Sequence, residues 1–147
     1  MEDYSKDFID YIKIFEGFKP KAYWIKGEYW DKAKTKKKYT IGYGTTVYAD
    51  GSPVKEGDVI TKEVAEAAIP TYLNSKVSHI KEYITNWDKL PQQAKEGVFS
   101  IVYRGGGLRK SPKFAQVLND AYQDGWMTTE EYQKVLSEMS FAHKGNL

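Results

Sequence analysis

Glu16 is the first residue whose type and position suggest chemistry. The apolar residues before it recur at helical spacing, so a helix is expected over about residues 4–15, ended by Gly17 and Pro20. Glu16 then lies in the last turn, where a negative charge opposes the helix dipole and adds little to stability. A partly buried acid at such a position is suited to general acid catalysis, although a solvated surface charge is the commoner explanation.

A glycine-rich stretch, Thr40–Gly44, supplies a second component of a site. It reads Thr-Ile-Gly-Tyr-Gly, with β-branched and aromatic residues that favour a strand. Glycine has no side chain, so the backbone at this stretch is able to approach a ligand closely. A carboxyl group at a helix end that faces such a strand is a workable arrangement for a general acid.

A run of lysines between Lys32 and Lys38 is the third feature, with lysine at positions 32, 34, 36, 37 and 38. A solvated hairpin tip is the simplest interpretation, and attraction to an anionic wall polymer or to a phosphate backbone is the functional alternative. Arginine, the preferred residue for bidentate contacts to phosphates and bases, occurs only at Arg104 and Arg109. No nucleic acid partner is therefore expected.

Composition excludes several other kinds of site. The chain has no cysteine, and its two histidines, His79 and His143, lack the neighbours of a metal site or of a Ser-His-Asp triad. We therefore expect neither a metal nor a cofactor. No stretch reaches the roughly 18 apolar residues of a membrane helix, and the N-terminus lacks the pattern of a signal peptide. These features predict synthesis in the cytoplasm without a signal peptide, and no membrane partner.

Short strands are expected to follow the first helix and to position Thr40. Their predicted ranges are Lys21–Ile25, Glu28–Asp31 and Lys38–Tyr43, with turns at Lys26-Gly27 and at Asp50–Pro53. These segments predict a small antiparallel sheet.

Helices are expected over most of the remaining chain. Thr61 is a suitable N-cap for a helix that reaches about residue 85, and Pro70 must kink or interrupt it. The later helices are predicted from Leu90 to the glycines at 105–107, from Ser111 to about Asp124, and from Thr128 to about residue 140.

The pattern as a whole predicts an α+β fold: a helix, a small sheet, a long connecting helix and an all-helical second lobe. We expect one domain over residues 1–147, with lobes at about 15–60 and 61–147. The helix at 4–15 is expected to pack on the second lobe.

The stretches Glu16–Tyr23 and Tyr39–Thr45 resemble the pattern of phage-type lysozymes, glycoside hydrolase family 24. In that family an E-G-x-x-x-x-x-Y stretch ends the first helix, and a T-I-G-x-G stretch lies in the following hairpin. Weaker similarity continues to about residue 120. The resemblance implies a lysozyme-like fold and hydrolysis of the β-1,4 bond between N-acetylmuramic acid and N-acetylglucosamine, by acid–base catalysis without a cofactor.

The resemblance also assigns roles to individual residues. Glu16 matches the general acid, and Thr40 matches the threonine that helps to hold the attacking water. Tyr43, Ser100 and Arg104 are expected to contact the sugar rings, although Arg104 stands where the family usually has asparagine.

The second acidic group is the main departure from the family pattern. The family usually places aspartate or cysteine nine residues after the glutamate, and this chain has Ile25 there. Asp31 is our preferred substitute because Tyr29-Trp30-Asp31 repeats the family's Y-x-D order six residues late. Glu28 is the competitor, and a third possibility is that neither residue serves.

The leading hypothesis is therefore a muramidase that acts as a monomer on bacterial peptidoglycan after release or delivery to the cell wall. Two alternatives stay open. One is a lytic transglycosylase-like reaction that works with a lone glutamate. The other is a glycan-binding module of lysozyme-like fold that has lost catalysis.

Overall fold

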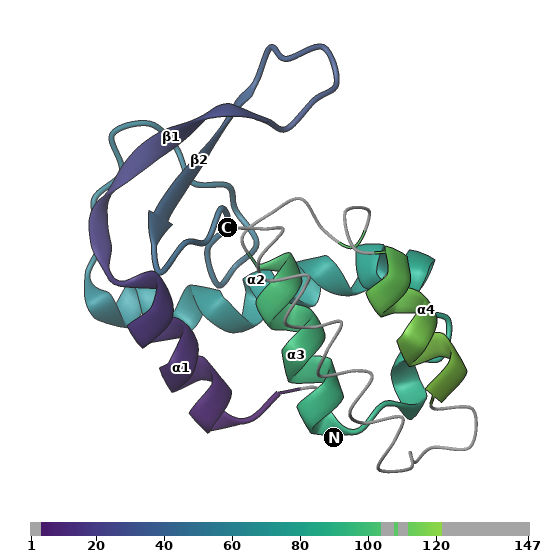
Figure 1. Cartoon of the computed structure of the whole chain (residues 1–147). Helices are drawn as coiled ribbons and strands as arrows, with labels where there is room; N and C mark the ends of the chain where they lie inside the picture. Colours follow the sequence, from purple (N-terminus) through teal and green to yellow (C-terminus); the bar gives the residue numbers. More distant parts are fainter. Residues whose placement is uncertain (1–3, 104–107, 109–111, 122–147) are drawn as a thin grey trace. The chain divides into compact units, whose positions relative to one another are not determined.

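The computed structural model describes residues 4–103, 108 and 112–121 (Figure 1). The elements in chain order are α1 (Lys6–Glu16), β1 (Lys19–Tyr29), β2 (Lys37–Gly42), α2 (Lys62–Tyr83), the 3-10 helix η1 (Trp87–Lys89), α3 (Gln92–Val102) and α4 (Pro112–Ala121). Helices and one antiparallel strand pair confirm the predicted α+β class. The helix predicted at about 128–140 lies outside the described residues.

The chain divides into two compact units. Residues Lys6–Ser75 form one, which we call the hairpin unit, and residues 1–5 with 76–147 form the other, the helical unit. Helix α2 contributes its first part to the hairpin unit and its last part to the helical unit. The lobe boundaries expected from the sequence, and the packing of the first helix on the second lobe, stay predictions.

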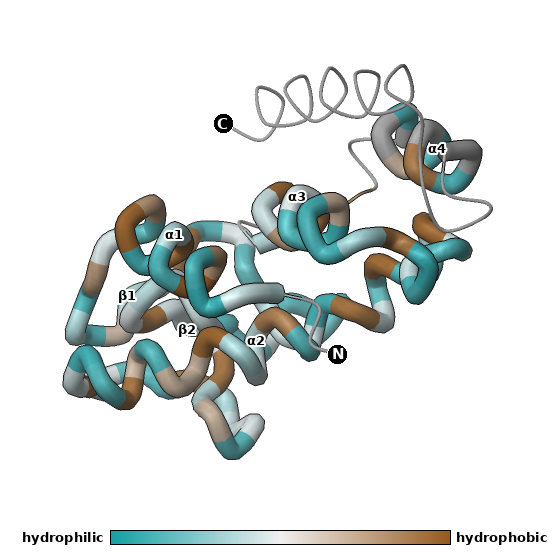
Figure 2. Tube along the Cα trace, turned by 90° about the horizontal axis from the view of Figure 1, so that it is seen from below, coloured by the Kyte–Doolittle hydropathy of each residue, from teal (hydrophilic) through white to brown (hydrophobic). Residues whose placement is uncertain are grey.

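Helix α1 ends in a left-handed C-cap that fixes the position of Glu16. Its apolar face buries Phe8 and Ile12, and hydrophilic and hydrophobic residues alternate around it (Figure 2). Gly17 follows with φ of 70°, and its amide donates to the carbonyl of Lys13 at 3.1 Å. This is the geometry of an αL cap, which glycine adopts without a steric penalty. The predicted end of the helix is confirmed to within one residue.

Strands β1 and β2 form one irregular hairpin rather than the three short strands expected. Trp24 pairs with Tyr39 and Tyr29 pairs with Lys37, so the four residues 25–28 of β1 face only one residue of β2. The predicted turn at Lys26-Gly27 is wrong. Gly27 does have a positive φ of 94°, but β1 accommodates it in an irregular, bulged stretch and continues to Tyr29.

The chain reverses direction after β1, in the loop Trp30–Lys36. The predicted turn near Asp50 is confirmed, because the Gly51 amide donates to the carbonyl of Tyr48 at 2.9 Å.

Helix α2 continues through Pro70 without interruption. Thr61 caps it, since its hydroxyl accepts from the amide of Val64 at 3.3 Å. The residues of α2 that the hairpin unit buries share one face, and they are Ala65, Ala68, Ile69, Tyr72 and Leu73. Packing of this face compensates for the hydrogen bond that the proline cannot make. In the part of the chain described, no helix combines the length and apolar character needed to cross a bilayer.

The helical unit has a core around helix α3. Phe99 is fully buried, with the Trp87 ring edge-on to it at 5.3 Å and Tyr4 at 6.0 Å. Helix α3 begins at Gln92, two residues after the predicted start at Leu90.

Candidate active site

Glu16 is the last residue of α1 and its side chain is half-buried. The chain turns sharply at Gly17 and enters β1, so the carboxyl group lies where the helix meets the hairpin. Phe18 follows and contacts Tyr43, with ring centroids 5.6 Å apart. The Lys13 ammonium lies 6.0 Å from the centroid of the Tyr43 ring. The end of α1 is thereby joined to the glycine-rich stretch after β2.

The Thr40–Thr45 segment is a compact loop. The amide of Ile41 donates to the carbonyl of Thr45 at 3.0 Å, and the amide of Thr45 donates back to the carbonyl of Ile41 at 3.1 Å. Gly42 has φ of 63°, and a Cβ atom there would lie 2.7 Å from the Cβ of Ala65. Only glycine therefore permits both this backbone conformation and the close approach of α2.

Thr40 is buried, at 5% exposure, and is opposite Tyr23 in the strand register. Opposed residues of an antiparallel pair lie on the same face, as do residues two apart in one strand. Lys38 is therefore on the Thr40 face, about 7 Å further along β2.

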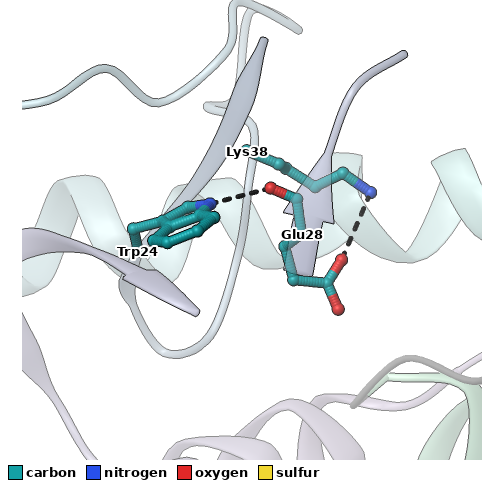
Figure 3. Close-up of polar contacts among 3 residues, drawn as sticks. All are labelled: Trp24, Glu28 and Lys38. Carbon is teal, nitrogen blue, oxygen red and sulfur yellow. Dashed lines mark hydrogen bonds and ion pairs between the residues drawn. The ribbon is translucent and has the colours of Figure 1, made fainter. Parts of the chain in front are cut away.

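Glu28 contacts the Thr40 face through an ion pair with Lys38. The Lys38 ammonium lies 3.9 Å from a carboxylate oxygen of Glu28, and both side chains are partly exposed (Figure 3). The indole N–H of Trp24 donates to the backbone carbonyl of Glu28 at 2.8 Å, across the irregular part of β1. The bulge thus shortens the path along β1 and places Glu28 near Lys38, which is two residues from Thr40 in β2.

The buried hydroxyl of Tyr72, on α2, links the two glutamates electrostatically. Burial raises the pKa of Tyr72, and the negative charges of Glu16 and of Glu28, followed by Tyr23, raise it further. Both carboxylates therefore lie near enough to Tyr72 for their charge to raise the pKa of its hydroxyl. The sequence analysis did not single out Tyr72, because the strand register that places Glu28 in the hairpin unit is not visible in the sequence.

Asp31 has a role within its own loop. Its carboxylate accepts the amides of Thr35 and of Lys36, each at 3.0 Å, and also the Thr35 hydroxyl. The Thr35 hydroxyl, followed by the Lys36 amide, lowers the pKa of Asp31. These contacts are those of an aspartate that stabilises a turn. A catalytic role for Asp31 stays a prediction.

The other expected residues are distributed over the two units. Tyr43 is 5% exposed and packs against Phe18, and Ile25 is 47% exposed. Ser100 belongs to helix α3, and its hydroxyl donates to the carbonyl of Gly97 at 2.7 Å. Arg104 lies outside the described residues. Among the residues that the structure describes, no group of three or more acidic, histidine or cysteine side chains could hold a metal ion.

The sequence profile of the Phage lysozyme family matches residues 13–139. The chain belongs to the phage lysozyme family. A comparison with curated proteins found no significant match. Membership of the phage lysozyme family confirms the predicted class of enzyme, a glycosidase that hydrolyses peptidoglycan in the cell wall.

Three solved structures share the fold of this chain. An endolysin from Escherichia coli O157:H7 phage FAHEc1 is 25% identical, with a TM-score of 0.56 over 97% of this chain and 93% of that one. A mutant of the lysozyme of phage P22 is 20% identical, with a TM-score of 0.62 over 99% and 97% of the two chains. The muramidase domain of SpmX from Asticaccaulis excentricus is 18% identical, with a TM-score of 0.56 over 94% and 95%. The last two show the fold alone.

Proposed function

We propose that this enzyme is a muramidase that cleaves the β-1,4 bond between N-acetylmuramic acid and N-acetylglucosamine. The observation that carries the proposal is the grouping of Glu16, Glu28 and Thr40 within the hairpin unit. The charges of Glu16 and Glu28 both raise the pKa of the buried Tyr72, and Glu28 pairs with a lysine on the Thr40 face of β2. A pair of carboxyl groups is the usual requirement for hydrolysis of a glycosidic bond.

Glu16 is the proposed general acid. Glu16 is half-buried at the end of α1, so part of the residue stays accessible to a substrate. In the complex with glycan it must be protonated, so that it can transfer a proton to the leaving oxygen. The αL cap at Gly17 keeps this side chain at the start of the hairpin.

Glu28 is the proposed second carboxylate, in place of Asp31. Asp31 already accepts three hydrogen bonds inside its loop, whereas Glu28 is partly exposed and makes a long ion pair with Lys38. Bulges commonly lie beside active sites and change the direction of a side chain. Here the bulge compensates for Ile25, which has no acidic group. Glu28 and Thr40 would orient water for attack on the anomeric carbon, with inversion of configuration.

Variants of the acidic residues test these roles in a turbidity assay with bacterial cell walls. We expect Glu16→Gln to lower the initial rate by about 10³-fold and Glu28→Gln by about 10²-fold, the range for loss of an acid or base. Asp31→Asn should stay within about twofold, since its bonds serve the loop. Glu63→Gln, an exposed isosteric change in the first turn of α2, is the matched control.

Three results would change the assignment. Full activity of Glu28→Gln with loss in Asp31→Asn would return the second role to Asp31. Full activity of both would favour the lone-glutamate reaction, which the isoleucine at position 25 also suggests. A wild-type protein that binds walls but is as inert as Glu16→Gln would be the glycan-binding module. Monomeric action, and the absence of nucleic acid and membrane partners, stay predictions.

A further inference from the structure

The loop between β1 and β2, together with the first two residues of β2, concentrates the positive charge of the protein. Residues 30–38 hold five lysines and one aspartate, a net charge of +4, whereas the whole chain carries +2. The rest of the chain is therefore at −2. In Figure 1 this loop extends beyond the paired part of the two strands. We call residues 30–38 the lysine tip.

The lysine tip is held together by its own hydrogen bonds. Asp31 accepts the amides of Thr35 and Lys36, and the amide of Trp30 donates to the carbonyl of Lys36 at 2.8 Å. Lys34 adopts a left-handed conformation, with φ of 59°. The one acidic group of the tip is thus used internally. The ammonium groups of Lys32, Lys34 and Lys36 have no carboxylate partner within 4.0 Å among the described residues.

Lysine ammonium groups lie over two tryptophan rings at this end of the hairpin, and Trp30 is 44% exposed. The Lys37 ammonium lies 4.5 Å from the centroid of a Trp24 ring, and the Lys38 ammonium lies 5.1 Å from that of Trp30. These cation–π contacts place a charged group on one face of each indole. A bilayer anchor would need apolar ring faces free to enter the lipid.

We propose that the lysine tip docks the enzyme on a linear phosphodiester polymer attached to the bacterial cell wall. Several closely spaced ammonium groups that lack acidic partners are complementary to a chain with one phosphate in each repeat, and binding releases the counterions of that chain. Lysine binds phosphate as a point charge, without the bidentate geometry that reads bases or planar groups. The interaction adds retention on the wall to the hydrolysis proposed above, and it rests on that proposed function only in using Glu16→Gln to prevent digestion.

The test is a binding measurement that is independent of catalysis. Glu16→Gln protein, used to prevent digestion, is added to purified walls that either keep their phosphodiester polymers or have been stripped of them with hydrofluoric acid. The tip variant K32Q/K34Q/K36Q is compared with K6Q/K21Q/K55Q, in which three exposed lysines elsewhere are replaced. Both variants change the net charge from +2 to −1.

We expect the tip variant, but not the matched control, to bind intact walls about tenfold more weakly at low salt. The slope of the logarithm of the association constant against the logarithm of the salt concentration should fall in magnitude by about 2, at roughly 0.7 for each lysine removed. The protein with the wild-type tip and the tip variant should bind equally to stripped walls. In the active background, the rate on stripped walls should be the same for both tips.

Several outcomes would overturn the proposal. Equal weakening in the two triple variants would mean that only net charge matters. Undiminished binding of the wild-type tip to stripped walls would identify the carboxylates of peptidoglycan as the ligand. Tip-dependent binding to vesicles that contain phosphatidylglycerol, with none to the phosphodiester polymer, would make the partner a membrane.

Discussion

Replacement of Gly42 by alanine tests the packing that positions the Thr40 strand. With φ of 63° the backbone is in the left-handed region, where a residue with a Cβ atom costs about 1–2 kcal/mol. The new Cβ would also lie 2.7 Å from the Cβ of Ala65 and 3.3 Å from Cδ1 of Ile60. The Ile60 methyl group is able to move, but Ala65 belongs to a helix, so the clash adds about 1–3 kcal/mol.

The two contributions together predict a loss of about 2–5 kcal/mol in the free energy of unfolding. For a chain of this length, that is a fall in Tm of roughly 4–20 °C. Urea titration and thermal melting, both followed by circular dichroism, measure the loss. The activity assayed well below the new Tm should also fall, because Thr40 lies two residues before Gly42 in the same strand.

Gly51→Ala is the matched control. Gly51 also has a positive φ, of 85°, but a Cβ atom added there would meet no atom within 4 Å. Its replacement should therefore cost only the conformational part, about 1–2 kcal/mol. If Gly42→Ala is no more destabilising than Gly51→Ala, the close approach of the strand to α2 is not the reason for glycine at position 42.

Three further substitutions have defined outcomes. Tyr48→Phe removes a 2.6 Å hydrogen bond to Asp58 and should cost about 1 kcal/mol at pH 7. That bond lowers the pKa of Asp58 in the folded protein. Its stabilisation is therefore present at pH values above the pKa of Asp58 in the unfolded chain, and it is lost as pH falls through the pKa in the folded protein. Urea titrations should give a smaller cost of Tyr48→Phe at pH 2.5 than at pH 7, and equal costs at the two pH values would contradict this. Phe99→Ala empties a fully buried site beside Trp87 and should cost about 3–5 kcal/mol by thermal melting, whereas a loss below about 1 kcal/mol would show that the core around α3 is different. Asp31→Asn should speed amide hydrogen exchange at Lys36 by roughly tenfold, since a carboxylate acceptor is worth about 1–2 kcal/mol more than an amide; unchanged exchange would remove the reason for assigning Asp31 to the loop.

The helical part of the fold was predictable because its signals are local. Periodic apolar residues and the following glycine located α1, Thr61 marked the start of α2, and Pro91 marked that of α3. The effect of Pro70 on the helix was harder to predict, because burial of one helix face outweighs the missing hydrogen bond and keeps α2 continuous. That balance depends on tertiary packing, which local rules do not include.

The candidate site was predictable only in part. Glu16 and Thr40 were predicted from their motifs, and both belong to the hairpin unit. The choice of a second carboxylate depended on the strand register, because Gly27 has a conformation that suits either a turn or a bulge. A turn there would have favoured Asp31, whereas the bulge places Glu28 near Lys38 and leaves Asp31 at the loop.

The most direct test of the central claim is mass analysis of peptidoglycan digested in water enriched in oxygen-18. Hydrolysis assisted by Glu16 and Glu28 predicts fragments that end in reducing N-acetylmuramic acid and carry one heavy oxygen at its anomeric carbon. The label should be absent from digests with Glu16→Gln. Fragments that end in 1,6-anhydro-muramic acid, without label, would show that no water attacks and would contradict the account.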